Sequence, residues 1–173
     1  MNSKNTLKIF GLIFGAILAV VILIVVGLFA VNKFAKDNEA IISYNQELVD
    51  QRNEIVDQIG KLSTAINEAD TIEEVEKEIA DYNAKVDEVE NSINSIKVPN
   101  KSGELKDKNI EYIATARGAA QKAQEAVDKA KAGEDTTSII KEYNEKIESL
   151  NDQNIEIAKL VNELVGYEAI KVE

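Results

Sequence analysis

Residues 72–96, with the sequence IEEVEKEIADYNAKVDEVENSINSI, carry the pattern that decides the fold. Apolar side chains recur in alternating steps of three and four residues along the whole stretch; they are Ile72, Val75, Ile79, Tyr82, Val86, Val89, Ile93 and Ile96. This spacing places all of them on a single face of an α-helix, as in the heptads of a coiled coil. The stretch therefore predicts a long helix that buries one face against other helices.

The two ends of this helix can also be predicted. Thr71 and Glu74 form a capping-box pattern, in which the Thr71 hydroxyl accepts a hydrogen bond from the Glu74 amide while the Glu74 carboxylate reaches back. Pro99, the only proline of the chain, disfavours a helical conformation for Val98. We therefore expect the helix to begin after Thr71 and to end near Val98.

Three more stretches show the same periodicity, and we expect helices over residues 37–67, 103–132 and 137–165. Gln51 and Gln58 interrupt the apolar seam of the first. The seam of the second is rich in alanine, which lets a neighbouring helix approach closely. Four helices of similar length joined by short connections predict an all-α, antiparallel up-down-up-down four-helix bundle with coiled-coil-like seams. The alternative is a pair of long hairpins that complete their core only in a dimer.

A few residues within these helices depart from the apolar pattern. Asn154 falls in the seam of the last helix and is the candidate for fixing the register of the core, as one buried asparagine does in coiled coils. Alternatively, a small rotation of that helix leaves Asn154 exposed to solvent. Gly60 and Gly118 lie inside helices, where close packing is the expected reason, and Gly133 is placed to cap the alanine-rich helix.

The beginning of the chain has a different composition. Residues 9–31 read IFGLIFGAILAVVILIVVGLFAV, 23 residues without a charge, which span about 34 Å as a helix and match the hydrocarbon core of a bilayer. We therefore divide the chain into a short basic tail (1–8), a transmembrane signal-anchor helix (9–31), an acidic helical bundle (37–165) and a C-terminal tail (166–173). The alternative is a cleaved signal peptide, for which residues 28–30 are the best but poor cleavage site.

The lysines around the apolar segment do not decide its orientation, because two precede it and two follow it closely. The short N-terminal tail and the large acidic domain favour a single-pass protein of the cell membrane, with the N-terminus inside and the C-terminal domain extracytoplasmic. Gly11, Gly15 and Ala19 form a ridge of small residues of the G-x-x-x-G type, which makes them candidates for association of the membrane helix in a homodimer. The alternative is that they are ordinary small residues of a membrane helix.

From residue 37 onward the chain has 16 basic and 31 acidic side chains, a net charge of −15. Such a charge repels nucleic acid and anionic lipid headgroups, so nucleic acid is not an expected partner. On the outer helix faces, acidic residues precede lysines by four positions and predict ion pairs. These predicted pairs are Glu73–Lys77, Asp81–Lys85, Glu104–Lys108, Glu125–Lys129 and Glu142–Lys146.

The residue types that carry most protein chemistry are missing from the sequence. It has no cysteine and no histidine, and its only methionine is Met1, so we expect no zinc, copper, haem or iron–sulfur site and no cofactor. Motifs for phosphate cradling or for an activated serine nucleophile are also missing. We therefore expect no catalytic residues and no enzyme activity.

Together these observations predict a non-enzymatic, membrane-anchored protein of a bacterial cell envelope, whose partners are the lipid bilayer and another protein, and whose extracytoplasmic bundle acts as an interaction or assembly module. A membrane helix that leads into an antiparallel bundle resembles the layout of the periplasmic sensor modules of bacterial chemoreceptors. That resemblance implies an alternative, a sensor-type or small-ligand-binding bundle that modulates a neighbouring membrane complex. A secreted helical protein is the second alternative.

Residues 166–173 predict a frayed tail, or an extended segment that adds to a partner as a strand.

Overall fold

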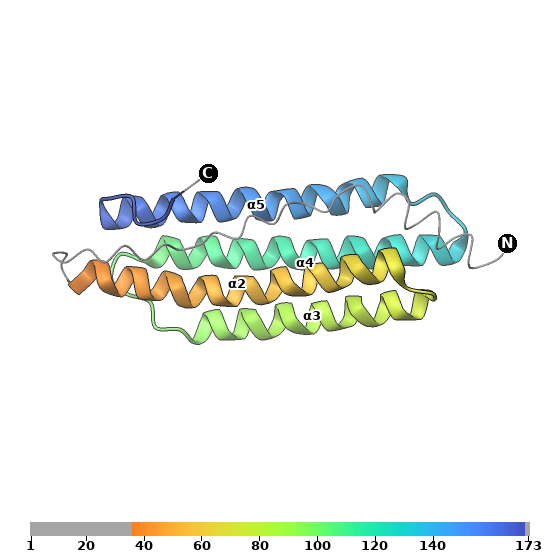
Figure 1. Cartoon of the computed structure of the whole chain (residues 1–173), viewed down its shortest axis with the longest axis horizontal. Helices are drawn as coiled ribbons and strands as arrows, with labels where there is room; N and C mark the ends of the chain where they lie inside the picture. The colour runs from red at the N-terminus through yellow and green to blue at the C-terminus, as the bar shows by residue number, and fades with distance from the viewer. Residues whose placement is uncertain (1–35, 172–173) are drawn as a thin grey trace.

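The structure, a computed structural model, describes residues 36–171. In this range it consists of four helices and no strands (Figure 1). The helices are α2 (Lys36–Glu68), α3 (Ile72–Ser95), α4 (Gly103–Ala132) and α5 (Thr137–Val165). The predicted all-α class is confirmed for these residues, because each expected helix forms at the expected place in the chain.

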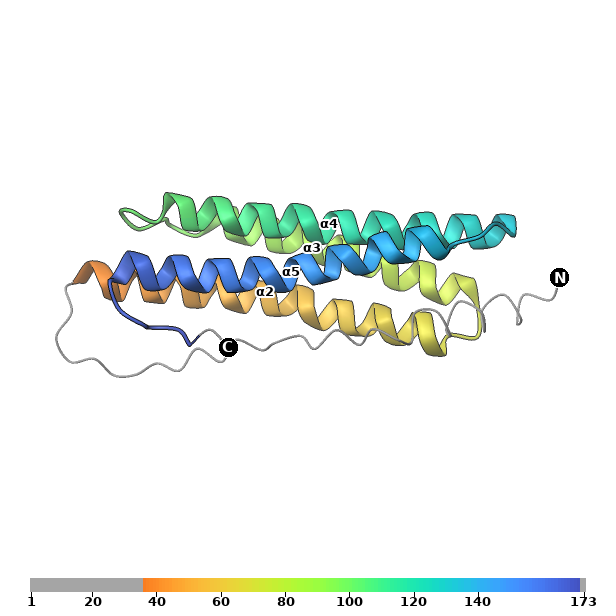
Figure 2. The same ribbon diagram turned by 90° about the horizontal axis from the view of Figure 1, so that it is seen from above.

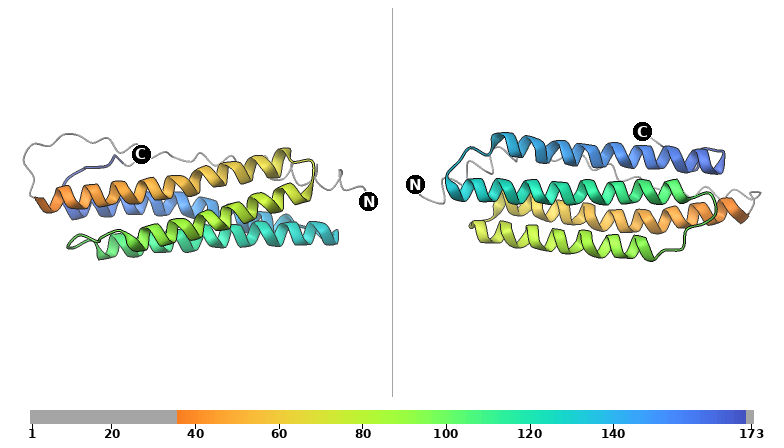
Figure 3. Two further views of the ribbon diagram at one scale, coloured as in Figure 1. Left: turned by 90° about the horizontal axis from the view of Figure 1, so that it is seen from below. Right: turned by 180° about the vertical axis from the view of Figure 1, so that it is seen from behind.

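The helices lie side by side, each antiparallel to the one before it (Figures 1 and 3). One end of the bundle, which we call the proximal end, holds the start of α2, the connection 96–102 and the end of α5; the distal end holds the connections 69–71 and 133–136 (Figure 2). Helix α2 packs mainly on α3 and has fewer contacts with α5. Buried side chains from all four helices form one hydrophobic core, so a single chain closes the bundle.

Helix α3 follows the predicted seam, with buried side chains at Val75, Ile79, Tyr82, Val86, Val89 and Ile93. The Thr71 hydroxyl accepts a hydrogen bond from the Glu74 amide at 3.3 Å, and the Glu74 carboxylate accepts one from the Asp70 amide at 3.1 Å. The helix ends at Ser95 rather than near Val98, because Ile96 already has an extended conformation (ψ 133°); the Ser95 hydroxyl and the Ile96 amide both donate to the Ser92 carbonyl, at 2.7 and 3.2 Å. The chain then continues into the connection 96–102.

Helix α4 is the alanine-rich helix, and its small side chains allow close packing on both neighbours. Gly118 lies under the aliphatic part of Lys146 from α5, since a Cβ atom at this glycine would lie 3.5 Å from Lys146 Cε. Gly133 ends the helix with a left-handed conformation (φ 75°), as predicted. The packing role expected for Gly60 is wrong, because no neighbouring atom lies within 4 Å of a Cβ built there.

The surface ion pairs differ from the predicted ones. None of the five predicted pairs forms among the described residues, and four of the five lysines, Lys77, Lys85, Lys108 and Lys129, contact other carboxylates instead. Lys85 of α3 lies 2.9 Å from Glu54 of α2, and Lys122 of α4 lies 2.7 Å from Glu142 of α5. Such exposed pairs join neighbouring helices, and each contributes at most about 1 kcal/mol to stability.

The chain after α5 folds back and packs on the bundle up to Ile170, so the expectation of a frayed tail is wrong there. Gly166 ends α5 in a left-handed conformation (φ 78°). The Asn162 side chain donates to the Ile170 carbonyl at 2.7 Å and accepts from the Ala169 and Ile170 amides at 2.8 Å. Ile170 is only 3% exposed and belongs to the hydrophobic core.

The predicted membrane helix, residues 9–31, lies outside the described residues. Gly11, Gly15 and Ala19, the candidates for association of that helix, lie outside them as well. Of the helices in the described range, none is long and apolar enough to cross a membrane.

Candidate functional site

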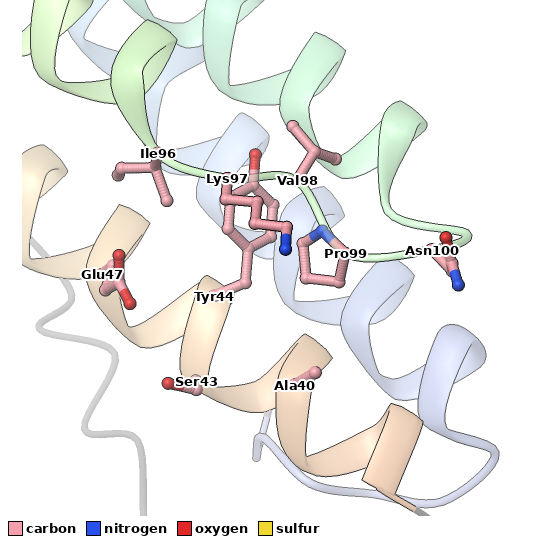
Figure 4. A pocket seen from close by; sticks show the side chains of 9 residues that line it. All are labelled: Ala40, Ser43, Tyr44, Glu47, Ile96, Lys97, Val98, Pro99 and Asn100. Atoms are coloured by element: carbon pink, nitrogen blue, oxygen red, sulfur yellow. The ribbon is translucent and has the colours of Figure 1, made fainter.

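A pocket of about 490 Å³ opens at the proximal end, between the first turns of α2 and the connection from α3 to α4 (Figure 4). Its lining residues are Ala40, Ser43, Tyr44 and Glu47 from α2, and Ile96, Lys97, Val98, Pro99 and Asn100 from the connection. Its volume lies in the range of about 300–1,000 Å³ that is typical of small-molecule sites. The pocket is therefore the candidate functional site of the described residues.

The local sequence explains why a hollow forms here. The short side chains of Ala40 and Ser43 leave room on the exposed side of α2 beneath the connection. Ile96 is extended, residues 97–99 have no regular secondary structure, and Lys101 then adopts a left-handed conformation (φ 69°). A hydrogen bond of 3.2 Å from the Ser102 amide to the Pro99 carbonyl completes the turn into α4. The chain thus bridges the pocket without filling it.

Tyr44 lies between α2 and the connection, as Figure 4 shows. Its side chain is 2% exposed, and its hydroxyl has no hydrogen-bond partner among the described residues. Burial raises the pKa of Tyr44, and the carboxylates of Asp107 and Glu47 raise it further. At neutral pH the hydroxyl is therefore a protonated donor without an acceptor, a state that costs free energy in a protein interior.

Two opposite charges stand at the rim of this pocket. The Lys97 ammonium and the Glu47 carboxylate both belong to exposed residues, and neither takes part in an ion pair within the described part of the chain. Some surface lysines of the described residues, such as Lys85 and Lys122, are paired, and others, such as Lys101, are not. The pocket thus presents one cation and one anion that are both available to a ligand.

A second polar feature lies inside the bundle, around the buried Arg52 of α2. Arg52 is 4% exposed and donates a hydrogen bond to the side-chain oxygen of Asn109 on α4. Its guanidinium carbon lies 6.0 Å from the ring centre of Tyr112, and Asn109 in turn donates to the Leu105 carbonyl at 2.6 Å. Burial lowers the pKa of Arg52 to about 10, an effect that Tyr112 partly opposes. The guanidinium therefore remains charged at neutral pH in the bundle interior.

Asn154, the predicted core-register residue, is half-buried on α5. Burial raises the pKa of the Tyr112 hydroxyl, whereas the Arg52 charge and the nearby Asn154 side chain lower it. The Tyr112 hydroxyl and Asn154 do not form a hydrogen bond of ordinary geometry. Asn154 thus lies at the edge of the polar layer around Arg52, and its role in fixing register stays a prediction.

The prediction from sequence missed the buried polar residues Asn45, Arg52 and Asn109, which are 2%, 4% and 0% exposed. A signal for the first two was present in the spacing. Alternating steps of four and three from Ile41 pass through Asn45 and Arg52 before they reach Ile55. Of the two predicted interruptions of this seam, Gln58 is buried at 6% exposure, whereas Gln51 is only half-buried.

Three tyrosines from α3, α4 and α5 lie close enough to influence one another: Tyr82, Tyr112 and Tyr143. The Tyr82 hydroxyl donates to the Ala116 carbonyl at 3.0 Å. Burial raises the pKa of each; that of Tyr143 reaches about 12, although Ser63 lowers it slightly. The hydroxyls of these three tyrosines are therefore neutral at physiological pH.

The buried tyrosines are expected to make the fold sensitive to alkali. Their folded pKa values lie above the ordinary value of about 10, so the stability that they contribute is complete below that pH and is lost as the pH rises toward the folded values, about 12 for Tyr143. Arg52 acts in the opposite sense, since its lowered pKa means that deprotonation above about 10 relieves a buried charge. We expect the combined effect of the tyrosines to exceed that of Arg52, so that the free energy of unfolding decreases as the pH rises above about 10.

The measurement is a pH titration followed by tyrosinate absorbance and far-UV circular dichroism. Most of the absorbance change should coincide with loss of helix, whereas in denaturant the tyrosines should ionise near their ordinary pKa of about 10. Ionisation at that ordinary pKa with the helices intact would contradict the burial of these rings.

Within the described range, no three Asp or Glu side chains gather closely enough to hold a metal ion. The candidate site therefore consists of the proximal pocket, with the buried layer around Arg52 below it as part of the core. Comparison of the whole chain with protein-family models, with curated proteins and with solved structures finds no match in any of the three.

Proposed function

We propose that the protein is a non-enzymatic, single-pass membrane protein of a bacterial cell envelope whose extracytoplasmic bundle binds another protein or stabilises an assembly. One observation carries this proposal: α2 begins at Lys36, only a few residues after the apolar segment 9–31. With the segment in a bilayer, the proximal end would stand next to the membrane. The connections 69–71 and 133–136 would then lie about 45 Å away, the length of a 30-residue helix.

The surface of the bundle supports a role in binding rather than in catalysis. Charged side chains cover the outer faces, and the distal connections carry carboxylates, including Asp70, Glu134 and Asp135. A surface of one dominant sign selects partners of opposite charge and speeds their encounter. A basic protein surface is therefore the partner that the distal end would favour. Association of two copies through Gly11, Gly15 and Ala19 remains part of the proposal.

The anchoring part is tested by fractionation of cells that express the full chain. The protein should stay with membranes during alkaline carbonate washing, because neither salt nor pH reverses the burial of 23 apolar residues. Protease added to intact spheroplasts should digest the bundle. Release by carbonate would refute the anchor, protection from protease until lysis would reverse the orientation, and cleaved protein in the medium would favour the secreted alternative.

The binding part is tested by crosslinking in membranes followed by purification of the full chain. Variants with a photo-crosslinking residue at Asp70 or Asp135 sample the distal end, and one at Asp152 on the side of α5 is the matched control. A basic partner should be captured from the distal positions and lost when Asp70 and Asp135 are replaced by lysine. Equal capture from Asp152 would place the interaction elsewhere.

A second candidate function, a small-ligand-binding bundle, is favoured by the proximal pocket. Its volume suits a small ligand, and it contains a buried hydroxyl without a partner among the described residues.

A further inference from the structure

We propose that the proximal pocket binds a phosphate ester that carries a primary ammonium group, as in the headgroup of phosphatidylethanolamine. The inference rests on the proposed membrane anchoring for the source of the ligand, and on the pocket itself for its chemistry. Four side chains carry the argument: Lys97, Glu47, Tyr44 and Ser43.

The charges of the pocket define the class of ligand. Lys97 lies on the connection and Glu47 on α2, so the two charges enter from opposite walls (Figure 4). A simple anion would be attracted by Lys97 and repelled by Glu47, and a simple cation would meet the reverse. A ligand with both charges can form an ion pair on each side of the pocket, with its phosphate at Lys97 and its ammonium at Glu47.

The neutral groups of the pocket fit a phosphate better than a carbon chain. Tyr44 contributes a protonated hydroxyl that lacks an acceptor among the described residues, and Ser43 lies one residue before it on α2. A phosphate oxygen that enters beneath the connection would give the Tyr44 hydroxyl its missing acceptor. Because the hydroxyl is shielded from solvent without a ligand, the connection must shift outward before a phosphate oxygen reaches it, and the hydrogen bond exists only in that bound state.

The apolar residues and the position of the pocket favour a lipid as the source. Ile96, Val98 and Pro99 are half-buried in the connection, and each keeps part of its apolar surface exposed. They would contact the glycerol and upper acyl region next to the headgroup. The acidic bundle as a whole repels anionic headgroups, whereas a zwitterionic headgroup carries no net charge and escapes this repulsion.

Glu47 provides selectivity between common zwitterions. A primary ammonium donates hydrogen bonds to a carboxylate, whereas the trimethylammonium of choline has no N–H donor. A glycerol headgroup lacks the cation altogether. We therefore expect the pocket to bind the ethanolamine headgroup most tightly. Its affinity for choline and glycerol headgroups should be about tenfold weaker, which is the effect of losing one charged hydrogen bond.

The test uses the full chain in phosphatidylcholine nanodiscs, with NMR of ring-labelled tyrosine to follow the Tyr44 signal. Soluble glycerophosphoethanolamine should shift this signal at about tenfold lower concentration than glycerophosphocholine or glycerophosphoglycerol. Lys97→Ala and Glu47→Gln should each weaken the response about tenfold. Lys101→Ala and Glu39→Gln, which change the same charges at the same end but outside the pocket, should leave it unchanged.

The outcomes separate the parts of the proposal. Nanodiscs in which phosphatidylethanolamine replaces part of the phosphatidylcholine should shift the Tyr44 signal without any soluble compound. If only the soluble compound shifts the Tyr44 signal, a lipid is not the source of the ligand. If all three headgroup compounds shift the signal equally, or if the pocket variants respond as the control variants do, the pocket is not the binding site. A chain that fails to enter nanodiscs refutes the anchor, whereas an inserted chain without a shift refutes this inference alone.

Discussion

Replacement of Ile79 by aspartate is expected to abolish the cooperative fold of the bundle. Ile79 is 1% exposed at the centre of the α3 seam. The substitution removes a large apolar side chain, which alone costs about 2–5 kcal/mol, and places a carboxylate where it must be neutralised or left unpaired. The total approaches the roughly 5–15 kcal/mol that stabilises an ordinary domain. Far-UV circular dichroism during thermal unfolding should show a loss of helix, or a transition displaced to much lower temperature.

Two controls separate this effect from a general sensitivity to mutation. Ile79→Val keeps an apolar side chain and should cost only about 0.5–1.5 kcal/mol. Glu73→Lys, at an exposed position in the first turn of α3 without an ion pair in the described structure, should cost no more than about 1 kcal/mol, the size of an exposed charge effect at a helix N-terminus. If Ile79→Asp unfolds at the same temperature as the wild type, the assigned core face of α3 is wrong.

Replacement of Asn109 by leucine is expected to destabilise the bundle by about 1.5–3 kcal/mol, although it exchanges a polar core residue for an apolar one of similar size. The loss arises because Arg52 remains buried and charged without the acceptor that it has in the wild type. Arg52→Met alone should have a small effect, since it removes the buried charge but leaves the Asn109 oxygen unpaired. Urea unfolding of each variant measures these differences.

The double variant that combines Arg52→Met with Asn109→Leu is the decisive comparison. It removes both partners of the buried hydrogen bond, so its stability should equal or exceed that of the wild type, as found when buried polar pairs are replaced by packed apolar groups. The two substitutions should therefore be strongly non-additive. Additive losses would mean that Arg52 and Asn109 contribute independently and that the buried layer is not a unit.

The fold could be predicted because the apolar spacing of α3 places all of its seam residues on one helix face, without a polar interruption. The stretch from Ile72 to Ile93 keeps this spacing at every step, and the helix boundaries follow from local chemistry at Thr71, Gly133 and Gly166. Helix α2 was harder to predict, because polar side chains occupy three of its buried positions, Asn45, Arg52 and Gln58. A pattern of apolar residues alone then fits more than one face, and only the packed neighbours decide which polar residue lies inside.

The pocket could not be predicted, because it depends on contacts between distant parts of the chain. It requires α3 to end at Ser95, three residues before the position that Pro99 indicated. It also requires the connection to pass over Ala40 and Ser43, more than fifty positions away in the sequence. Nothing in the local sequence of α2 distinguishes Tyr44 as a pocket residue rather than an ordinary core residue.

The proximal position of both ends of the bundle has a mechanical consequence. The Asn38 side chain on the first turns of α2 donates a hydrogen bond of 2.9 Å to the Val165 carbonyl at the end of α5. Tension between the start of α2 and the tail would therefore act across adjacent points and peel the two helices apart, instead of shearing them along their length. Contacts between α2 and α5 are fewer than those between consecutive helices, so the bundle would resist such tension weakly. A tether that had to bear load would need attachment at the distal connections, where force would run along the helices.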